Sequence, residues 1–429
     1  MAVTLADVAA RAGVSAATVS RVLSGNYPVA GATRSRVLRA VDELEYVVNG
    51  PASALAAASS DLVGILVNDI ADPFFGIIAG AVQSEMNGAE GGPGAGPRKL
   101  AVVCNTGGSP GQELTYLTLL QRQRAAAVVL TGGAVEDPEH SAALEGRLRR
   151  LAADGTRVVL CGRPPLRTPG ERGGRPGKPD GASGEPAGEA VAEAGEPVRV
   201  WDTVRAEEPG AEGRRQARTP LERRAVRALL PEQRGGSGEG LGILTVAFDN
   251  RGGARALTAH LLALGHRAVG YVAGPPERTT TRHRLEGHRA ALAAHSPGLS
   301  AGAERLTVHG GGYDRGSGYD GALELLRRAP EVTAVLAAND TVALGVCAAL
   351  RERGLRVPED VSVAGFDDLP FSADASPALT TVRLPLYEAG ARAGRLALGR
   401  QAPPPGGVAT VRAELMVRAS TAPPRPRTG

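Results

Sequence analysis

Apolar and polar residues alternate in a regular pattern along most of the chain. Over residues 61–163, the apolar runs LVGILV, KLAVVC, AAAVVLTG and RVVLCG are separated by longer amphipathic stretches. Strand-like runs that alternate with helical patterns predict βαβ units around a parallel sheet. The pattern returns over residues 243–383, with ILTVAFDN, AVGYVAG, AVLAAND and VSVAGFDD. We therefore expect two similar α/β lobes.

The segment between the two lobes has a different composition. Residues 166–240 contain 14 Gly and 8 Pro, and their 13 basic residues balance their 13 acidic ones. A stretch of this composition buries too little apolar surface to offset the entropy that is lost on ordering. We expect a disordered insertion with one helix over residues 221–230. A passive loop expansion and a lid or partner-binding role both remain open for it.

The composition narrows the class of protein. The 42% of hydrophobic and 22% of charged residues among 429 are typical of a globular chain, and no apolar run is long enough to span a membrane. The first residues lack the pattern of a secretory signal, so we expect a cytoplasmic protein. Cys104, Cys161 and Cys347 form no disulfide framework or zinc motif. The net charge of +4 permits a nucleic-acid partner without arguing for one.

The first residues carry the signals of a helix-turn-helix. In VTLADVAARAGVSAATVSRVL, which spans residues 3–23, Thr4 and Asp7 predict a capping box, and Ser15 predicts the N-cap of a second helix. Gly13 supplies the backbone freedom of the tight turn between the helices. Two short helices joined by such a turn match a DNA-binding helix-turn-helix, although any small helical hairpin shows similar caps.

The second helix of this hairpin has an outward face suited to DNA. Val19 and Val22 lie on its buried side, which leaves Ala16, Ala17 and Arg21 pointing outward. Small residues at the start of the helix allow close approach to base edges, and arginine can donate two hydrogen bonds to guanine. The hydroxyls that we expect to meet phosphates belong to Thr4, Ser15, Thr18, Ser20 and Thr33.

This N-terminal segment resembles the LacI/GalR (lactose-repressor/galactose-repressor) family of bacterial transcription regulators. The likeness continues through the third helix, TRSRVLRAVDELEY, and covers nearly the whole chain except residues 166–240. It implies that Ala16, Ala17 and Arg21 read bases. It also implies a hinge that folds on operator DNA and inserts Leu55 as a wedge into the minor groove, unless Leu55 is an ordinary linker residue.

Two positions in the N-terminal segment depart from the family pattern. Val48 stands where the family usually has proline before the hinge. Ala30 stands where a serine commonly caps the third helix, and alanine has no side-chain oxygen for that role. The affinity for DNA is therefore expected to be modest.

Polar side chains follow the strand-like runs of both lobes. Ligands of open parallel sheets bind at the carboxyl ends of the strands. Asn68, Asp69 and Asp72 follow LVGILV, Asn339 follows AVLAA, and Asp367 follows VSVAGF. Such amide and carboxylate groups supply the paired donors and acceptors that a neutral polyol needs.

The second half of the chain resembles the periplasmic-binding-protein-like sensor of the same family. The resemblance rests on GPPERTTTRHRLEGH, AANDTVALG, VAGFDD and PALTTVRLPLYEAG. It implies that Arg284, Asn339 and Asp367 hydrogen-bond a small effector. The residues implied to line the same cleft are Asp72, Phe75, Thr280 and Tyr313.

Some neighbouring residues have simpler interpretations or differ from the family. Asp340 is expected to be the N-cap of the helix that follows it, and Asp368 to cap a turn. Gly162 stands where the family often has an aspartate before Arg-Pro, so ligand specificity is expected to differ here.

No enzyme motif accompanies these features. The chain has no Gly-rich phosphate loop with its lysine, no nucleophile elbow and no HExxH. His260, His266, His283 and His288 are expected to be satisfied surface imidazoles. We expect no catalytic activity, cofactor or metal.

The expected fold is α/β: an all-α helix-turn-helix head followed by a two-lobed, periplasmic-binding-protein-like parallel α/β sensor domain. The expected boundaries are 1–48 for the head, 49–59 for the hinge and 60–423 for the sensor, with an N-lobe of 61–163 and 384–408 and a C-lobe of 241–383 and 409–420.

The hypothesis is a homodimeric repressor that binds a near-palindromic operator in double-stranded DNA and responds to a sugar. A regulator that senses a nucleobase or a partner protein, and a sugar-binding transport component, are the alternatives.

Overall fold

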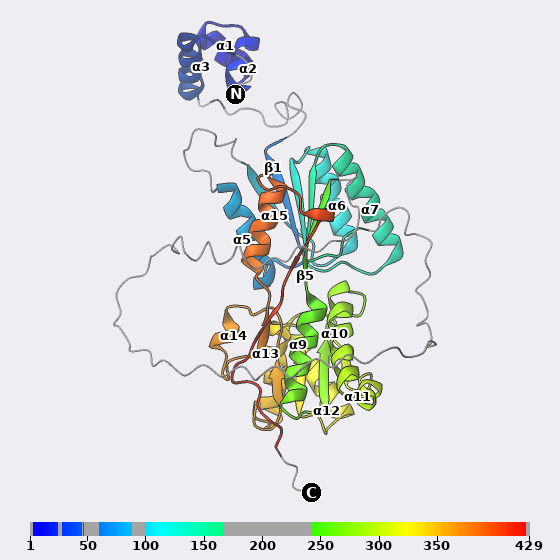
Figure 1. The fold of residues 1–429 in the computed structure, drawn as a ribbon. Helices are drawn as coiled ribbons and strands as arrows, with labels where there is room; N and C mark the ends of the chain where they lie inside the picture. Colours follow the sequence, from blue (N-terminus) through cyan, green and yellow to red (C-terminus); the bar gives the residue numbers. More distant parts are fainter. Residues whose placement is uncertain are drawn as a thin grey trace, which may run out of the picture. The chain divides into compact units, whose positions relative to one another are not determined.

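The computed structural model describes residues 3–24, 28–44, 46, 60–87, 99–166 and 242–425 (Figure 1). Two sequence predictions fall outside these ranges. They are the hinge over residues 49–59 with its wedge Leu55, and the insertion over residues 166–240 apart from its first residue.

The head consists of α1 (Leu5–Ala12), α2 (Ala16–Ser24) and α3 (Gly31–Glu43). The predicted capping box is confirmed. The Thr4 hydroxyl accepts a hydrogen bond from the Asp7 backbone N–H at 3.4 Å, and the Asp7 carboxylate accepts one from the Thr4 N–H at 2.8 Å. Gly13 ends α1 at φ 65°, in the left-handed region that glycine adopts without strain.

A small apolar core holds the three head helices together. Val8 of α1, Val19 of α2 and Val37 of α3 are fully buried in one cluster. Ala30 precedes α3 without a side-chain capping bond, as the sequence predicts. An ion pair between Arg11 and Glu43 adds a contact between α1 and α3 at the surface.

The N-lobe is built on a six-stranded parallel sheet in the order β11-β5-β4-β3-β1-β2. Its strands are β1 (Leu62–Val67), β2 (Leu100–Asn105), β3 (Ala127–Thr131), β4 (Arg157–Cys161), β5 (Ile243–Phe248) and β11 (Val408–Val411).

Two expected lobe boundaries are wrong. Residues 243–248 were expected in the C-lobe, but β5 pairs with β4 and β11. The N-lobe likewise continues through β11 to Val411 instead of ending at residue 408. The error has a physical cause: the chain crosses between the lobes directly after a strand, and an apolar run does not show which sheet it joins.

Helices cover both faces of the N-lobe sheet. Figure 1 shows α5 (Pro73–Asn87) and α15 (Leu386–Ala397) on one face, and α6 (Pro110–Arg122) and α7 (Pro138–Ala153) on the other. A Cβ atom at Gly390 of α15 would lie 2.6 Å from the Ile78 carbonyl oxygen of α5. Glycine at this position therefore permits the close packing of the two helices.

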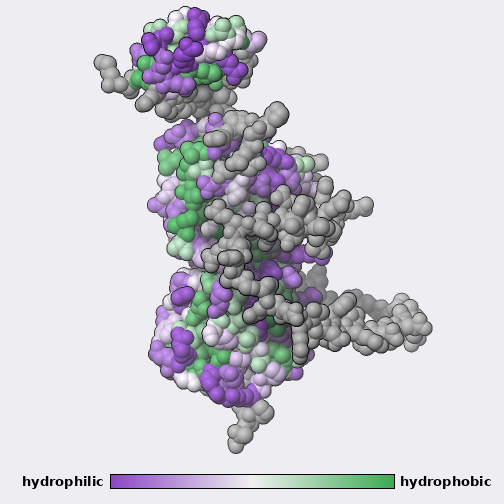
Figure 2. Space-filling view, turned by 90° about the vertical axis from the view of Figure 1, so that its left-hand side faces the viewer, coloured by the Kyte–Doolittle hydropathy of each residue, from purple (hydrophilic) through white to green (hydrophobic). Residues whose placement is uncertain are grey.

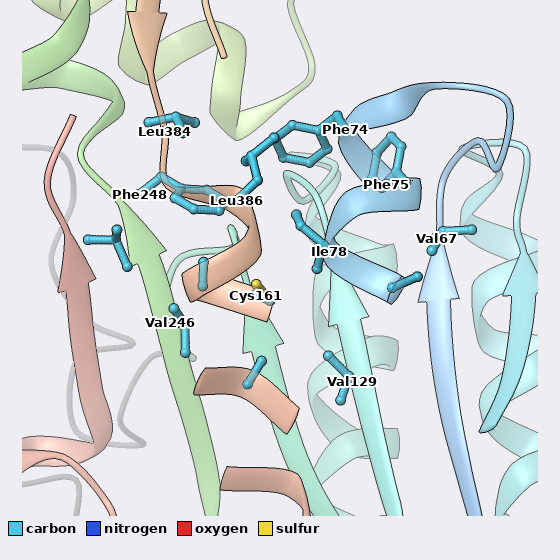
Figure 3. Packing of buried hydrophobic residues seen from close by; sticks show 14 of the residues in the cluster. Val67, Phe74, Phe75, Ile78, Val129, Cys161, Val246, Phe248, Leu384 and Leu386 are labelled. Atoms are coloured by element: carbon cyan, nitrogen blue, oxygen red, sulfur yellow. The ribbon is translucent and has the colours of Figure 1, made fainter. Parts of the chain in front are cut away.

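The N-lobe core extends to the carboxyl ends of its strands. Phe74 and Phe75 at the start of α5 lie beside Phe248 and Leu386 in Figure 3. The Phe74 ring meets the rings of Phe75 and Phe248 edge to face, with centroids 5.0 and 6.1 Å apart. A cluster of buried aromatic residues therefore lies next to the polar residues that follow the strands.

The C-lobe has a four-stranded parallel sheet in the order β7-β6-β8-β9. Its strands are β6 (Val269–Ala273), β7 (Thr307–His309), β8 (Ala334–Ala337) and β9 (Ser362–Ala364). Its helices are α9 (Asn250–Ala263), α10 (Thr279–His295), α11 (Pro297–Gly302), α12 (Arg315–Arg328), α13 (Asp340–Glu352) and α14 (Phe371–Asp374). Two short strands, β10 (Thr381–Arg383) and β12 (Glu414–Met416), pair antiparallel beside it, and a 3-10 turn, η3 (Pro405–Gly407), precedes β11.

The chain passes between the lobes three times. We call these passages the first crossover (residues 248–250, β5 to α9), the second crossover (383–386, β10 to α15) and the third crossover (411–414, β11 to β12). The Asp249 backbone N–H donates to the Val411 carbonyl at 3.0 Å, which joins the first crossover to the third.

Candidate DNA-reading face and effector cleft

The reading face of α2 is exposed as the sequence predicts. Ser15 precedes α2, and its hydroxyl accepts a hydrogen bond from the Thr18 N–H at 3.2 Å. Ala16, Ala17 and Arg21 are exposed, whereas Val19 and Val22 face the head core. The head therefore presents small side chains and an arginine at the start of a capped helix.

The predicted phosphate-binding hydroxyls are not equivalent. Ser20 is exposed on α2, and Thr33 is half-buried on α3. The Thr4 hydroxyl donates to the Asp7 carboxylate at 2.7 Å, and the hydroxyls of Ser15 and Thr18 lie 2.9 Å apart. Three of the five hydroxyls thus already have partners within the head, so on DNA they would have to share or exchange those bonds.

Arg284 is the centre of the polar site in the C-lobe. It lies on α10 with only 3% of its surface exposed. Its Nε donates to Asn250 Oδ1 at 2.9 Å, Nη1 to the Ala338 carbonyl at 2.5 Å and Nη2 to Asp367 Oδ1 at 2.7 Å. Its Cζ also lies 3.8 Å from the centre of the Phe366 ring. These contacts fix the plane of the guanidinium.

Asp367 faces Arg284 from a strained turn after β9. Its φ of 102° and the φ of 55° at Asp368 lie in the left-handed region, which costs energy for a residue with a side chain. Burial raises the pKa of the Asp367 carboxyl, although Arg284 opposes that rise. The strained backbone and the buried carboxylate thus occur at the point where two predicted effector-binding residues, Arg284 and Asp367, are in contact.

Asp340 holds this turn in place. Its carboxylate accepts hydrogen bonds from the Leu369 N–H at 2.8 Å, the Ser372 hydroxyl at 2.7 Å and the Thr381 hydroxyl at 2.5 Å. Burial raises the pKa of Asp340 to about 7, and the Asp367 charge adds to the rise. The expectation that Asp340 caps α13 is therefore wrong.

Asn339 is the residue that caps α13. Its backbone is extended, and its Oδ1 accepts from the Val342 N–H at 2.8 Å. Its Nδ2 donates to the Tyr313 carbonyl at 3.3 Å, and the Tyr313 hydroxyl lies 2.7 Å from Thr281 Oγ1. Asn339 and Tyr313 are thus linked, and Asn339 keeps one further N–H for a ligand.

Asp368 forms two ion pairs. Its carboxylate accepts from Arg383 Nε at 2.7 Å and from Arg418 Nη2 at 2.6 Å. These bonds tie the turn to β10 and to the C-terminal segment. The expectation of a simple turn cap understated this role.

The N-lobe contributes Asp72 and Phe75. Asp72 is half-buried, and its Oδ1 accepts from the Phe74 N–H at 2.9 Å. The pKa of Asp72 is raised to about 6, mainly by burial. The charges of Asp367 and Asp69 contribute to this rise, and the hydrogen bond from Phe74 and the charge of Arg284 oppose it. Phe75 is packed into the N-lobe core.

A short pairing joins the lobes beside Thr280. The Glu136 N–H donates to the Glu277 carbonyl at 2.6 Å, and the Thr279 N–H donates to the Ala134 carbonyl at 3.0 Å. We call residues 134–136 and 277–279 the inter-lobe clasp. A Cβ atom at Gly133 would lie 2.3 Å from Thr280 Oγ1, so glycine lets the two lobes meet at the predicted cleft residue.

One residue that contacts the site was missed from the sequence, and so was a buried tyrosine whose hydroxyl is unpaired among the described residues. Asn250, which bonds Arg284, follows the apolar run ILTVAF, and its place after a strand was the available signal. The Tyr271 hydroxyl is fully buried and has no hydrogen-bond partner among the described residues. Burial raises the pKa of Tyr271. The charges of Tyr313 and Asp367 also raise it, and the charge of Arg284 lowers it. No sequence signal separates this tyrosine from an ordinary core residue.

Gly162, which differs from the family pattern, is followed by a residue of a buried charge cluster in the N-lobe. Arg163 is 5% exposed and forms an ion pair with Glu113 of α6. Glu113 also bonds His140 of α7 at 3.1 Å, and these two partners hold the pKa of its carboxyl at about 2 despite burial. Arg163 thus turns into the lobe next to the start of the segment 166–240.

The described residues contain no cluster of His, Cys, Asp and Glu that could hold a metal ion.

His266 and His288 are buried, so the expectation of surface imidazoles is wrong for them. Burial lowers the pKa of His288 to about 4. Within the described ranges, no helix is both long and apolar enough to cross a membrane.

Comparison with known proteins gives consistent matches. Residues 4–49 match the family described as "Bacterial regulatory proteins, lacI family", and residues 258–421 match the "Periplasmic binding protein-like domain". The HTH-type transcriptional regulator CelR of Thermobifida fusca is 30% identical over 92% of this chain and 91% of its own length. The HTH-type transcriptional regulator MalR of Streptomyces coelicolor is 30% identical over 98% and 97%.

Solved structures show the same arrangement of elements. A complex of transcriptional regulator CelR with cellobiose is 27% identical, covers 97% of this chain and 99% of that one, and has a TM-score of 0.54. The lac repressor dimer bound to operator is 23% identical, covers 98% and 100%, and has a TM-score of 0.64, which supports the fold alone.

Proposed function

The chain belongs to the LacI family of bacterial regulatory proteins. From this premise we propose that it is a repressor whose binding to operator DNA is changed by a neutral sugar. The observation that carries the proposal is the presence in one chain of two sites. One is a capped recognition helix with an exposed face, and the other is a buried Arg284–Asp367 pair at the carboxyl ends of the sensor strands. The relatives are transcriptional regulators, which agrees with the absence of enzyme motifs.

The head would read the major groove through α2. Ala16 and Ala17 would contact thymine methyl groups, and Arg21 would donate to a guanine. The hydroxyls of Ser20 and Thr33 would meet phosphates and fix the register without reading the sequence. In the hinge, Leu55 would kink the duplex from the minor groove.

The charges of the cleft favour a neutral effector. Among the residues predicted to bind the effector, Arg284 is the one cation, whereas Asp72 and Asp367 both carry carboxylates, so we expect a phosphorylated or acidic ligand to be disfavoured. Arg284 has five N–H donors, of which three are used within the protein. The remaining donors and Asp367 Oδ2 suit neighbouring hydroxyls of a sugar.

An aromatic ligand is less favoured by the same geometry. Phe75 is 8% exposed and packs edge to face with Phe74, so it offers little area for stacking a nucleobase. The related CelR structure holds cellobiose. A sugar therefore remains the better hypothesis than a purine.

A second copy of the chain is the expected partner. The edge strand β2 exposes 64% of Leu100 and 41% of Val103, and Ile70 nearby is 51% exposed. Figure 2 shows apolar residues gathered on the N-lobe face that lies on the left in Figure 1. A two-fold dimer through such a surface would place two heads on a near-palindromic operator in the cytoplasm.

Effector binding would act on DNA through the lobes. Closure of the cleft would change how the lobes of two copies meet, and thereby whether both hinges can order on DNA. By linkage, operator binding must change the effector affinity by the same factor.

The test is a selection of bound duplexes from random DNA by the purified full chain, repeated with cellobiose, maltose, galactose, ribose, guanine and hypoxanthine. We expect a two-fold symmetric site whose occupancy changes with one sugar. A strictly monomeric protein with no preference among duplexes would overturn the proposal. A response to a purine alone would replace the sugar but keep the regulator.

A further inference from the structure

Asn250 lies where the chain passes from one lobe to the other. It is the first residue of α9 and the last of the first crossover, and it is 5% exposed. The preceding residue, Asp249, donates its N–H to Val411 at 3.0 Å, and its side chain caps α9 through the Gly252 N–H at 2.8 Å. The position of Asn250 is therefore fixed by the first and third crossovers together.

The side chain of Asn250 binds the effector-site arginine. Its Oδ1 accepts from Arg284 Nε at 2.9 Å in a buried contact. Because an arginine N–H can only donate, the amide must present its oxygen rather than its nitrogen to Arg284. Asparagine also adds this acceptor without a second buried carboxylate beside Asp367.

A second nitrogen of the same guanidinium is bonded to a residue that contacts the second crossover. Nη2 donates to Asp367 Oδ1 at 2.7 Å. The backbone N–H of Asp367 donates to the Val382 carbonyl at 2.7 Å, and the Leu384 N–H donates to the Asp367 carbonyl at 3.4 Å. One arginine thus links Asn250 on the first crossover to Asp367, whose carbonyl is bonded to Leu384 of the second.

We infer that Asn250 is a positioning residue that couples the Arg284 guanidinium to the crossovers, so that occupancy of the effector site is transmitted directly to the three crossovers between the lobes. This inference rests on the proposed effector role of Arg284. A ligand that forms a hydrogen bond with the Arg284 guanidinium or with Asp367 therefore contacts a hydrogen-bonded network that includes all three crossovers. Loss of Asn250 Oδ1 leaves Arg284 anchored by Ala338 and Asp367 but disconnects it from the first and third crossovers.

The first test needs neither effector nor DNA. Full-length Asn250→Ala, Asn250→Asp and the control Arg255→Ala, an exposed position on the same helix, are compared with the parent chain by amide hydrogen exchange and by NMR of ¹⁵N-labelled arginine. In Asn250→Ala we expect faster exchange at residues 382–384 and at 411–413, and loss of one slowly exchanging arginine Nε–H signal. Asn250→Asp keeps the acceptor and is expected to restore both, and Arg255→Ala is expected to change neither.

The second test uses calorimetry with cellobiose, maltose, galactose and ribose as probes. For a sugar that the parent chain binds, we expect Asn250→Ala to weaken binding by about tenfold, because a buried hydrogen bond to a charged group is lost. Asn250→Asp is expected to stay within about threefold.

The two tests separate the inference from the function. If Asn250→Ala changes exchange only around the start of α9 and leaves the arginine signal intact, the positioning role is wrong. If the parent chain binds none of the four sugars, the proposed effector class fails, and the exchange experiment still decides the role of Asn250.

Discussion

Arg284 and Asp367 form an ion pair of 2.7 Å between two side chains that are each only 4% exposed. A charge buried to this extent needs its partner, because the protein interior does not solvate it as water does. The pair is therefore both a structural element of the C-lobe and a direct bond between two residues of the predicted effector site.

Removing the carboxylate should separate sensing from DNA binding. We expect Asp367→Asn, which keeps the shape, to abolish the response to the sugar while operator binding survives in a mobility-shift assay. Asp367→Ala should in addition lower the free energy of unfolding by about 3–5 kcal/mol. The exposed Asp374→Asn serves as the control, and a normal response in Asp367→Asn would place the ligand elsewhere.

Arg21→Ala tests base reading by the head. We expect a loss of about 1–3 kcal/mol for the selected operator and little loss for random DNA, because a base contact supplies specificity rather than general affinity. Competition binding at fixed salt measures both. Equal losses on the two duplexes would mean that Arg21 contacts only phosphate, and Arg36→Ala at an exposed position on α3 serves as the control.

Thr4→Ala tests the capping box. The substitution removes the oxygen that accepts from the Asp7 N–H, so the head should lose about 1 kcal/mol of stability. Thermal unfolding followed at the head, with the exposed Ala10→Ser on the solvent side of α1 as control, measures the effect. An unchanged melting temperature would show that the other head contacts suffice.

Glu113 should make the N-lobe sensitive to acid. Its pKa of about 2 in the folded chain lies below its ordinary value of 4.5. Its contribution is therefore fully present above about pH 4.5 and is lost as the pH falls toward 2, with a total of about 3 kcal/mol. The difference between unfolding curves of the parent chain and Glu113→Gln should shrink over that interval, and a difference that does not depend on pH would contradict this reasoning.

Asp72 should give sugar binding a different pH dependence. Its pKa is raised to about 6, so the carboxylate is largely protonated at pH 5 and ionised at pH 7.5. Since an ionised carboxylate is the stronger acceptor for a hydroxyl, we expect affinity to rise with pH across this range by about fivefold. Calorimetry at both pH values tests this, and Asp72→Asn should reduce the dependence to the part that is due to Asp340, whose pKa is about 7.

The sequence was sufficient for features that depend on neighbouring residues. The capping box of Thr4 and Asp7, the left-handed Gly13 and the exposed Arg21 follow from spacing within one or two turns, and the structure confirms them. The α/β alternation gave both lobes for the same reason.

Features that depend on distant residues were not predictable in the same way. An apolar run gives a strand but not its sheet, which is why β5 was placed in the wrong lobe. Asn339 and Asp340 are adjacent polar residues after one strand, and only the backbone and three distant donors distinguish the cap from the buried carboxylate. Arg163 and Glu113 are 50 residues apart, so their pairing requires the folded chain.

The inter-lobe clasp carries a practical consequence. Its two rungs, from Glu136 to Glu277 and from Thr279 to Ala134, are made by main-chain groups that every amino acid except proline possesses. Substitutions of side chains in the predicted effector site therefore leave these two main-chain bonds available. A variant with altered ligand specificity would keep this part of the contact between the lobes.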